Sequence, residues 1–179
     1  MKLSNPLTSY VLGGGCFWCL DAIYRQLKGV VKVESGYSGG QTIDPDYYQV
    51  VTGATGHAEV VRVTFDELII PSSVVLDVFF AAHDPTSLNR QGADIGTQYR
   101  SIMLYADDVQ KNQFKQALNR ASAQLDKPIV TEVVPLESFY LAEAEHQDYF
   151  NKQPAAGYCS IVIAPKMTQV RAKYTGWFN

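Results

Sequence analysis

The chain has 179 residues, of which 46% are hydrophobic and 12% aromatic, enough to build one substantial core without disulfide bonds. We therefore expect a single domain, residues 1–179, that acts as a monomer. The formal net charge of −3 offers no overall basic field of the kind that attracts nucleic acid or anionic membranes. The start, 1–9, is polar and no later run approaches the length of a membrane span, so we expect a cytoplasmic protein without a secretory signal.

Hydrophobic periodicity predicts a series of strands and helices along the chain. Strands are expected at 10–12, 30–35, 57–65, 101–106 and 129–136. Helices are expected at 20–27, 71–82, 107–125 and 138–152. A flexible stretch is expected at 154–159. The end of the chain, 160–179, begins apolar and becomes mixed, which leaves a strand and a packed tail as alternatives.

The order of these elements favours an α+β protein, because neighbouring strands are not always separated by a helix. We expect a two-layer sandwich with a mixed central sheet, and a purely parallel, doubly wound sheet is the alternative. Two long segments without a sustained period, 41–56 and 86–99, interrupt the regular elements, and loops of this length are often functional. Glu59 lies near the start of the strand at 57–65, and we expect its carboxyl group to face the interior.

The stretch GGGCFWC, 13–19, has the composition of a reactive site. It lies between a predicted strand and a predicted helix, which places Cys16 at or near a helix N-terminus. Unpaired backbone N–H groups and the helix dipole stabilise an anion there, so Cys16 is expected to tend toward the nucleophilic thiolate. A buried structural cysteine is the alternative, and the clustering of Phe17, Trp18 and Cys19 beside Cys16 argues against it.

A cysteine thiolate can attack an acyl carbon, a disulfide or an oxidised sulfur, and each target needs different helpers. Acyl transfer needs a histidine base, and each histidine of the chain also has a plausible structural role: His57, His83 and His146. Disulfide exchange suits the C-x-x-C spacing of Cys16 and Cys19, although the tryptophan lies between the cysteines. Zinc would need these two residues, Cys159 and a fourth ligand such as His146, but no second paired motif is present.

Several strings within about 10–159 closely resemble the A-type peptide methionine sulfoxide reductases, the MsrA family. They are GGGCFWC, SGYSGG, DPDYYQVVTGATGHAEVVRV, HDPTSLNRQGADIGTQYRS and EAEHQDYF. The most specific parts are GCFW, GHAE and GTQYRS. The resemblance implies the family's two-layer α/β sandwich with a mixed sheet, a ferredoxin-like plait. It also implies reduction of the S epimer of methionine sulfoxide, free or within proteins, to methionine.

The resemblance assigns roles to particular residues of this chain. Cys16 would attack the sulfoxide sulfur, and Glu59 would protonate the oxygen, which is a poor leaving group without a proton. Tyr47 and Tyr99 match the two family tyrosines that hydrogen-bond this oxygen. Asp94 matches the carboxylate that fixes the substrate and a nearby water.

Two neighbours of these residues complete the implied substrate site. Phe17 and Trp18 would form the apolar pocket for the ε-methyl group of the substrate. Tyr48 adjoins Tyr47, and Tyr47 is preferred because it directly follows the Asp-Pro-x triplet at 44–46.

The implied reaction leaves Cys16 as a sulfenic acid, which condenses with another thiol. Cys19 is near in sequence, although an i,i+3 bridge needs the first helical turn to open. Cys159 matches the family's C-terminal recycling cysteine. We expect both to take part, in an order left open, with thioredoxin as final reductant, dithiothreitol as its substitute in vitro, and no bound cofactor or metal. Two other readings are a general thiol-disulfide oxidoreductase using Cys16 and Cys19, and a silent module that binds oxidised methionine.

Overall fold

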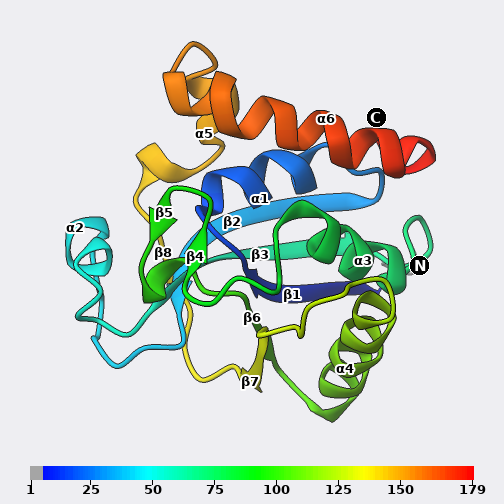
Figure 1. Cartoon of the computed structure of the whole chain (residues 1–179), viewed down its shortest axis with the longest axis horizontal. Helices are drawn as coiled ribbons and strands as arrows, with labels where there is room; N and C mark the ends of the chain where they lie inside the picture. The colour runs from blue at the N-terminus through cyan, green and yellow to red at the C-terminus, as the bar shows by residue number, and fades with distance from the viewer. Residues whose placement is uncertain (1–5) are drawn as a thin grey trace, which may run out of the picture.

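A computed structural model describes residues 6–179 of the chain. The fold is based on a six-stranded β-sheet (Figure 1). The strand order is β7-β6-β1-β3-β2-β8. The strands are β1 (Leu7–Gly13), β2 (Val30–Ser38), β3 (Ala58–Asp66), β6 (Ile102–Tyr105), β7 (Glu132–Pro135) and β8 (Tyr140–Leu141). All neighbours pair antiparallel except β6 and β7, which are parallel. The sheet is therefore mixed, as predicted, and the doubly wound parallel alternative is wrong.

Six helices and a small hairpin complete the regular elements of the described chain. The helices are α1 (Phe17–Arg25), α2 (Tyr47–Val51), α3 (Ser72–Ala82), α4 (Asp108–Ser122), α5 (Tyr149–Lys152) and α6 (Ala164–Lys173). The hairpin consists of β4 (Arg90–Gln91) and β5 (Asp94–Ile95). Within residues 6–179, no helix combines the length and the apolar character needed to cross a membrane. Residues 1–5, part of the polar start at 1–9, lie outside the described residues.

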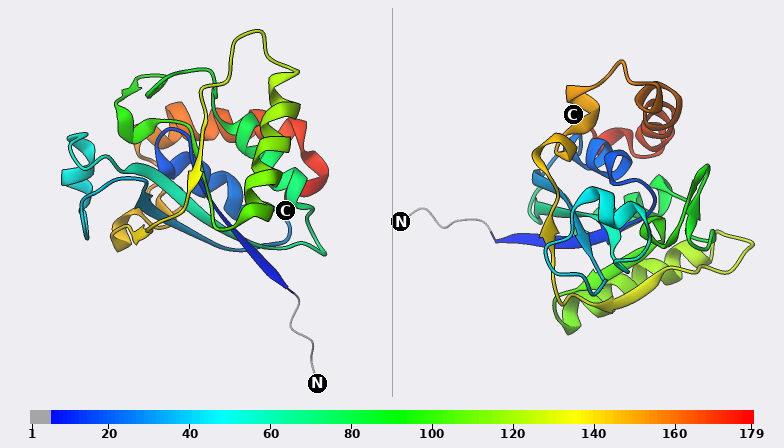
Figure 2. Two further views of the ribbon diagram at one scale, coloured as in Figure 1. Left: turned by 90° about the horizontal axis from the view of Figure 1, so that it is seen from below. Right: turned by 90° about the vertical axis from the view of Figure 1, so that its left-hand side faces the viewer.

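Alternation along the strands separates two apolar clusters on the two faces of the sheet. On one face, side chains such as Leu12 and Val61 pack with Leu20 of α1 and Phe79 of α3. On the other face, a smaller cluster is covered by the segment 134–139. Helix α6 packs on α1 and α3, outside the first helical layer (Figures 1 and 2). This face therefore carries both the start of α1 and the C-terminal segment.

The predicted helix at 138–152 is wrong. Its first part forms β8, in which Tyr140 and Leu141 pair with the edge of β2. A 3-10 turn follows at Ala144–His146, and Asp148 then adopts a left-handed conformation with φ of 54°, which no continuous α-helix contains. Only the short α5 remains helical.

The strand alternative for 160–179 is wrong, and the segment is instead a helix and a tail packed on α1 and α3. Cys159 is fully buried at the start of a π-helical turn, Cys159–Ile163, which continues into α6. The buried residues Cys159, Ile163, Met167 and Val170 recur at intervals of three to four positions, the period of a helix. This spacing is visible in the sequence and could have identified the helix.

Candidate active site

The turn between β1 and α1 is packed so tightly that it requires glycine. A Cβ atom on Gly14 would lie 2.6 Å from the ring of His83. Gly15 has a φ of 84°, and its N–H donates to the carbonyl oxygen of Tyr99 at 3.1 Å. Glycine is the residue that adopts such a conformation without strain. The turn therefore fixes the backbone that leads into Cys16.

Cys16 is the N-cap of α1, as the sequence predicts, but its side chain is 8% exposed and lies next to a carboxyl group. Burial, followed by the charge of Glu59, raises the pKa of the Cys16 thiol well above its usual value. A helix N-terminus stabilises an anion by only about 0.3–1 kcal/mol at an exposed site, less than the cost of burying a charge. The expected tendency toward thiolate is therefore not supported by the position of Cys16 in the fold, where burial favours the neutral thiol.

Glu59 is a buried carboxyl group on β3 with one oxygen unused. Glu59 is only 1% exposed, and its Oε1 accepts a hydrogen bond from the backbone N–H of Phe17 at 3.2 Å. Among the described residues, Oε2 has no hydrogen-bond partner. Burial raises the pKa of Glu59 to about 8, and the charge of Asp94 adds to the effect. The group therefore holds a proton at neutral pH and has an oxygen available to a ligand.

Tyr47 and Tyr99 reach this centre from two loops. Asp46 caps α2 in a reciprocal bond with Gln49 and so sets Tyr47 at the first helical position. Tyr99 ends a 3-10 turn, Thr97–Tyr99. Burial raises the pKa of Tyr47 to about 12 and raises that of Tyr99 further, with smaller contributions from the charge of Glu59. Both phenols keep their protons and can donate hydrogen bonds.

The other candidate tyrosine lies outside this cluster. Tyr48 is 74% exposed, whereas Tyr47 is half-buried and lies close enough to Glu59 for its charge to affect the phenol. The structure therefore places Tyr47, and not Tyr48, beside the thiol and carboxyl groups.

Asp94 lies on β5 at the rim of a cavity of about 570 Å³ that also includes Cys16 and Cys19. Its Oδ2 accepts from the hydroxyl of Tyr158 at 2.7 Å, and this hydroxyl lies 4.0 Å from the sulfur of Cys19. Tyr158 immediately precedes Cys159 in the chain. The contact thus joins the start of the C-terminal helix to the hairpin at the mouth of the cavity.

The two predicted pocket aromatics have different environments. Phe17 is fully buried and belongs to the core. Trp18 is half-buried and stacks on Tyr149 with ring centroids 3.7 Å apart. Its indole N–H donates to Nδ1 of His146 at 3.2 Å. Trp18 is therefore the accessible aromatic wall of the pair.

The segment 143–158 contributes contacts that the sequence did not predict, although His146 was considered as a base and as a zinc ligand. Glu143 accepts from the hydroxyl of Tyr37 at 3.0 Å and from the backbone N–H of Tyr47 at 3.1 Å. His146 and Tyr149 pack on Trp18. The string EAEHQDYF lies in this segment. It contributes to the resemblance to the family, but it does not indicate which side chains these residues contact.

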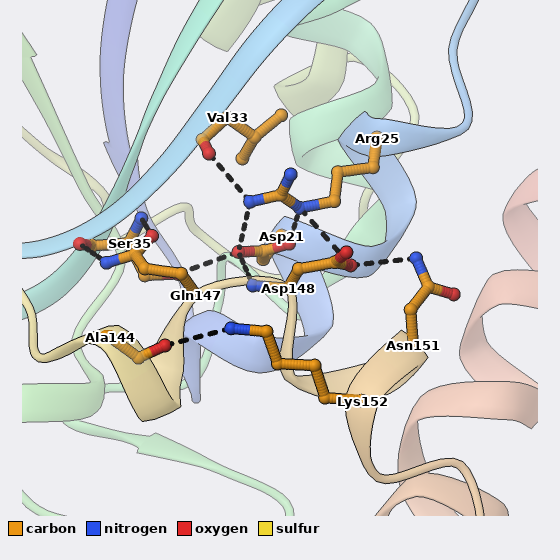
Figure 3. A network of polar contacts seen from close by, with 9 residues as sticks. All are labelled: Asp21, Arg25, Val33, Ser35, Ala144, Gln147, Asp148, Asn151 and Lys152. Carbon is orange, nitrogen blue, oxygen red and sulfur yellow. Dashed lines mark hydrogen bonds and ion pairs between the residues drawn. The ribbon is translucent and has the colours of Figure 1, made fainter.

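A polar network holds this segment against α1 and β2 (Figure 3). Asp21, which is 1% exposed, pairs with Arg25 and accepts from Ser35 Oγ at 3.0 Å and from the backbone N–H of Asp148 at 3.3 Å. The amide of Gln147 bonds the backbone of Ser35 in both directions, each at 2.8 Å. These bonds set the position of the turn that carries His146.

Cys19 and Cys159 lie in one small buried cluster with Ala22 and Ile163. All three cysteines are free thiols. The zinc ligand set considered from the sequence is not assembled. In the described part of the chain, the one group of three or more potential ligands within reach of each other is Glu143, Glu145 and His146. It contains no cysteine.

Two of the three histidines are fixed in structural roles. His57 accepts from the N–H of Gly40 at 2.9 Å, and its other nitrogen bonds the carbonyl of Thr42 at 2.7 Å. His83 bonds the carbonyl of Phe79 and the hydroxyl of Ser101, and burial lowers its pKa to about 4. With both ring nitrogens engaged, neither residue is available as a base.

A neutral acid beside a cysteine suits chemistry in which oxygen leaves an oxidised sulfur, so fold and site together define a thiol-dependent oxidoreductase. The family model described as peptide methionine sulfoxide reductase matches residues 8–177. The chain belongs to this family. It is an oxidoreductase that reduces methionine sulfoxide in a thiol-dependent reaction.

Relatives and solved structures agree with this assignment. Peptide methionine sulfoxide reductase MsrA of Pseudarthrobacter chlorophenolicus is 57% identical over 97% of this chain and 99% of the relative. The Acinetobacter baumannii protein of the same name is 50% identical, over 92% of this chain and 94% of its own. Reduced Mxr1 from Saccharomyces cerevisiae has a TM-score of 0.79 at 31% identity, covering 86% of this chain and 89% of Mxr1.

Methionine sulfoxide reductase A of Corynebacterium diphtheriae also has a TM-score of 0.79, at 32% identity over 87% of this chain and 79% of its own. The predicted family and activity are confirmed. The comparisons give no support to a general thiol-disulfide oxidoreductase.

Proposed function

We propose that this enzyme reduces the S epimer of methionine sulfoxide, free or within proteins, through a sulfenic acid on Cys16. The observation that carries the proposal is the pairing of Cys16 with Glu59, a carboxyl group whose pKa is raised to about 8 by burial. At neutral pH both groups are protonated. Glu59 can therefore give a proton to the substrate before the thiolate of Cys16 forms.

The proposed chemical step moves the oxygen atom from substrate sulfur to cysteine sulfur. Glu59 gives its proton to the sulfoxide oxygen, and the resulting carboxylate takes the proton of the Cys16 thiol. The Cys16 sulfur attacks the substrate sulfur and forms a transient S–S bond. The hydroxyl oxygen then bonds to the Cys16 sulfur as S–OH, while the S–O and S–S bonds to the substrate sulfur both break. Methionine leaves with its sulfur reduced, and Cys16 is oxidised by the same two electrons. The thiolate therefore forms only when a sulfoxide is bound.

The neighbouring side chains orient the substrate in this scheme. Tyr47 and Tyr99 retain their protons and donate to the sulfoxide oxygen. Trp18 contacts the ε-methyl group, and Phe17 supports it from the core. Asp94, already bonded to Tyr158, helps to hold the substrate and a water molecule.

The sulfenic acid is then resolved by a second thiol, with loss of water and formation of a disulfide. Because Cys19 and Cys159 share one buried cluster, the disulfide can pass from Cys16 to Cys19 and on to Cys159, or form directly with Cys159. A structure of Mxr1 in complex with Trx2 supports thioredoxin as the final reductant. The match to the family over residues 8–177 supports one reductase domain over 1–179. We expect a monomer without a bound cofactor, and a cytoplasmic location stays a prediction.

Turnover of the separated S and R epimers with dithiothreitol tests the proposal. The native protein is expected to reduce only the S epimer, and Cys16→Ser is expected to have no activity. A circular dichroism spectrum matching that of the native protein would show that the variant is folded. Turnover of the R epimer, or full activity of folded Cys16→Ser, would contradict the proposal.

A further inference from the structure

Lys166 is a half-buried, positively charged side chain in the wall of the cavity that contains Cys16 and Cys19. It lies in the first turn of α6. Val162 and Gln169 line the same cavity and are separated from Lys166 by three or four positions, the spacing of one helix face. The C-terminal helix therefore turns one face toward the cavity, and Lys166 gives that face its positive charge.

The charge of Lys166 is not used in an ion pair. Within residues 6–179, no carboxylate is paired with this ammonium group. Asp84 and Asp94 also line the cavity, but Asp84 accepts hydrogen bonds from Thr86 and Asp94 accepts one from Tyr158. The charge is therefore available to other groups that line the cavity.

The thiol of Cys19 is one of the groups that this charge reaches. Burial raises the pKa of Cys19, and the charge of Lys166 is the largest effect that opposes the rise. The hydroxyl of Tyr158 also lowers this pKa, whereas the charges of Asp94 and Cys159 raise it. Because the thiolate is the form that attacks another sulfur, these groups together set the reactivity of Cys19.

The cavity brings Cys19, rather than Cys159, next to Cys16. Cys16 and Cys19 both line it, whereas Cys159 is fully buried and is not part of the lining. The backbone N–H of Cys19 donates to the carbonyl oxygen of Cys16 at 3.2 Å, so the two residues share one helical turn. A sulfenic acid on Cys16 would therefore lie in the same cavity as Cys19 and Lys166.

We propose that Lys166 is a positioning residue for the second step of the reaction and stabilises Cys19 as the thiolate that attacks the sulfenic acid on Cys16. The proposal rests on the proposed function, which supplies the sulfenic acid. It gives the C-terminal helix an electrostatic role in resolution, in addition to carrying Cys159.

The step balances in atoms and electrons. The Cys19 sulfur bonds to the Cys16 sulfur while the S–O bond of the sulfenic acid breaks. Glu59 gives a proton to the departing hydroxyl, which leaves as water; the proton of Cys19 goes to solvent, and solvent returns one to Glu59. Cys19 is oxidised from the thiol level and Cys16 is reduced from the sulfenic acid level, so both end at the disulfide level.

A single turnover of the S epimer without reductant tests the role of Lys166. Samples quenched in acid and analysed by mass spectrometry give the amounts of sulfenic acid and disulfide against time. Lys166→Met is expected to slow disulfide formation about threefold at neutral pH. Loss of the nearby charge lowers the thiolate fraction about tenfold but raises the nucleophilicity of the thiolate about threefold. Lys166→Arg keeps the charge and is expected to match the native rate.

Two further variants separate an effect on Cys19 from an effect on the helix. Lys173→Met removes an exposed charge from the same helix and should leave the rate unchanged. In Cys19→Ser, addition of Lys166→Met should not slow disulfide formation with Cys159, and a sulfenic acid that persists there would identify Cys19 as the attacking thiol.

A native rate in Lys166→Met would overturn the proposal, as would the same slowing in the Cys19→Ser background. Native protein that forms no methionine in the turnover would overturn the proposed function itself.

NMR spectroscopy of the reduced protein measures the ionisation of Cys19 without the reaction. The ¹³Cβ resonance of Cys19 is expected to titrate at a higher pH in Lys166→Met than in the native protein and in Lys166→Arg. Equal titration midpoints in the native protein and Lys166→Met would overturn the proposal, even if the variant slowed disulfide formation.

Discussion

At the scale of single residues, the site depends on the opposing needs of stability and catalysis at Glu59. A carboxyl group in this buried position must stay protonated, whereas in the unfolded chain it ionises near its ordinary pKa of about 4.3. Because the pKa of Glu59 is near 8 in the folded protein, its contribution to the free energy of unfolding is most favourable below its pKa in the unfolded chain. This contribution decreases as the pH rises toward 8. The proposed catalytic acid is thus protonated at neutral pH at the expense of folding free energy.

Replacement of Glu59 with glutamine is expected to separate these two effects. Glu59→Gln should reduce turnover by at least about a hundredfold, because a general acid contributes at least that factor. It should raise the free energy of unfolding at pH 8 by at most about 3–5 kcal/mol, with little gain at pH 4.

Native turnover should itself decline above about pH 8, where Glu59 loses its proton. Thermal melts and pH–activity profiles of the native protein and the variant check these expectations. A gain in stability of Glu59→Gln over the native protein that is no larger at pH 8 than at pH 4 would contradict them.

Residue identities could be predicted from the sequence better than their ionisation. GCFW, GHAE and GTQYRS contain the proposed nucleophile, the proposed acid and one of the two proposed tyrosine donors. The protonation state of Cys16 could not be predicted, because it depends on burial of the thiol and on a carboxyl group 43 positions away in the chain. His146 was considered from the sequence only as a base or a zinc ligand, since its hydrogen bond with Trp18 joins residues 128 positions apart.

At the scale of elements, the decisive feature is the attachment of the segment 144–152 to α1 and β2 by Asp21. Sequence pattern predicted β3, α3 and α4 well because their periods are regular. It failed at 138–152, where pairing with the edge of β2 and the left-handed Asp148 override helical spacing. It also missed the helix that contains Cys159, because the exposed apolar residue Ile161 and the proline at 165 obscure the helical spacing of the buried positions.

Removal of the Asp21 carboxylate is expected to loosen this segment. Asp21→Ala should lower the free energy of unfolding by about 2–3 kcal/mol, since it leaves Arg25 and two hydrogen-bond donors without their buried partner. It should also speed hydrogen exchange in 144–152. The matched control is Asp77→Ala, which breaks a more exposed ion pair with Arg120 and should cost less than about 1 kcal/mol. If urea denaturation showed the same loss of unfolding free energy for Asp21→Ala and Asp77→Ala, the role of the network would be contradicted. Unchanged hydrogen exchange at 144–152 in Asp21→Ala would contradict it as well.

At the scale of the whole molecule, the strand order brings together groups that are distant in the sequence. The central strands β1 and β3 place Cys16 beside Glu59, and β2 with β8 delivers the segment that ends at Cys159. A mixed two-layer sandwich was predictable from the order of elements, because two successive strands lack a helix between them. The neighbours of each strand were not predictable, since pairing depends on contacts that no local pattern contains. The packing of Cys159 on Cys19 therefore had to come from the structure.

The central claim is that Cys16 accepts the oxygen of the sulfoxide and passes its oxidation to a neighbouring thiol. The most direct test is one equivalent of the S epimer without reductant, followed by mass spectrometry of all three cysteines. We predict one methionine per chain and a disulfide that contains Cys16 or joins Cys19 to Cys159. A Cys19→Ser, Cys159→Ser double variant should retain the sulfenic acid on Cys16, detectable by dimedone. Methionine formed without oxidation of any cysteine, or a stable sulfenic acid in the native protein, would contradict the account.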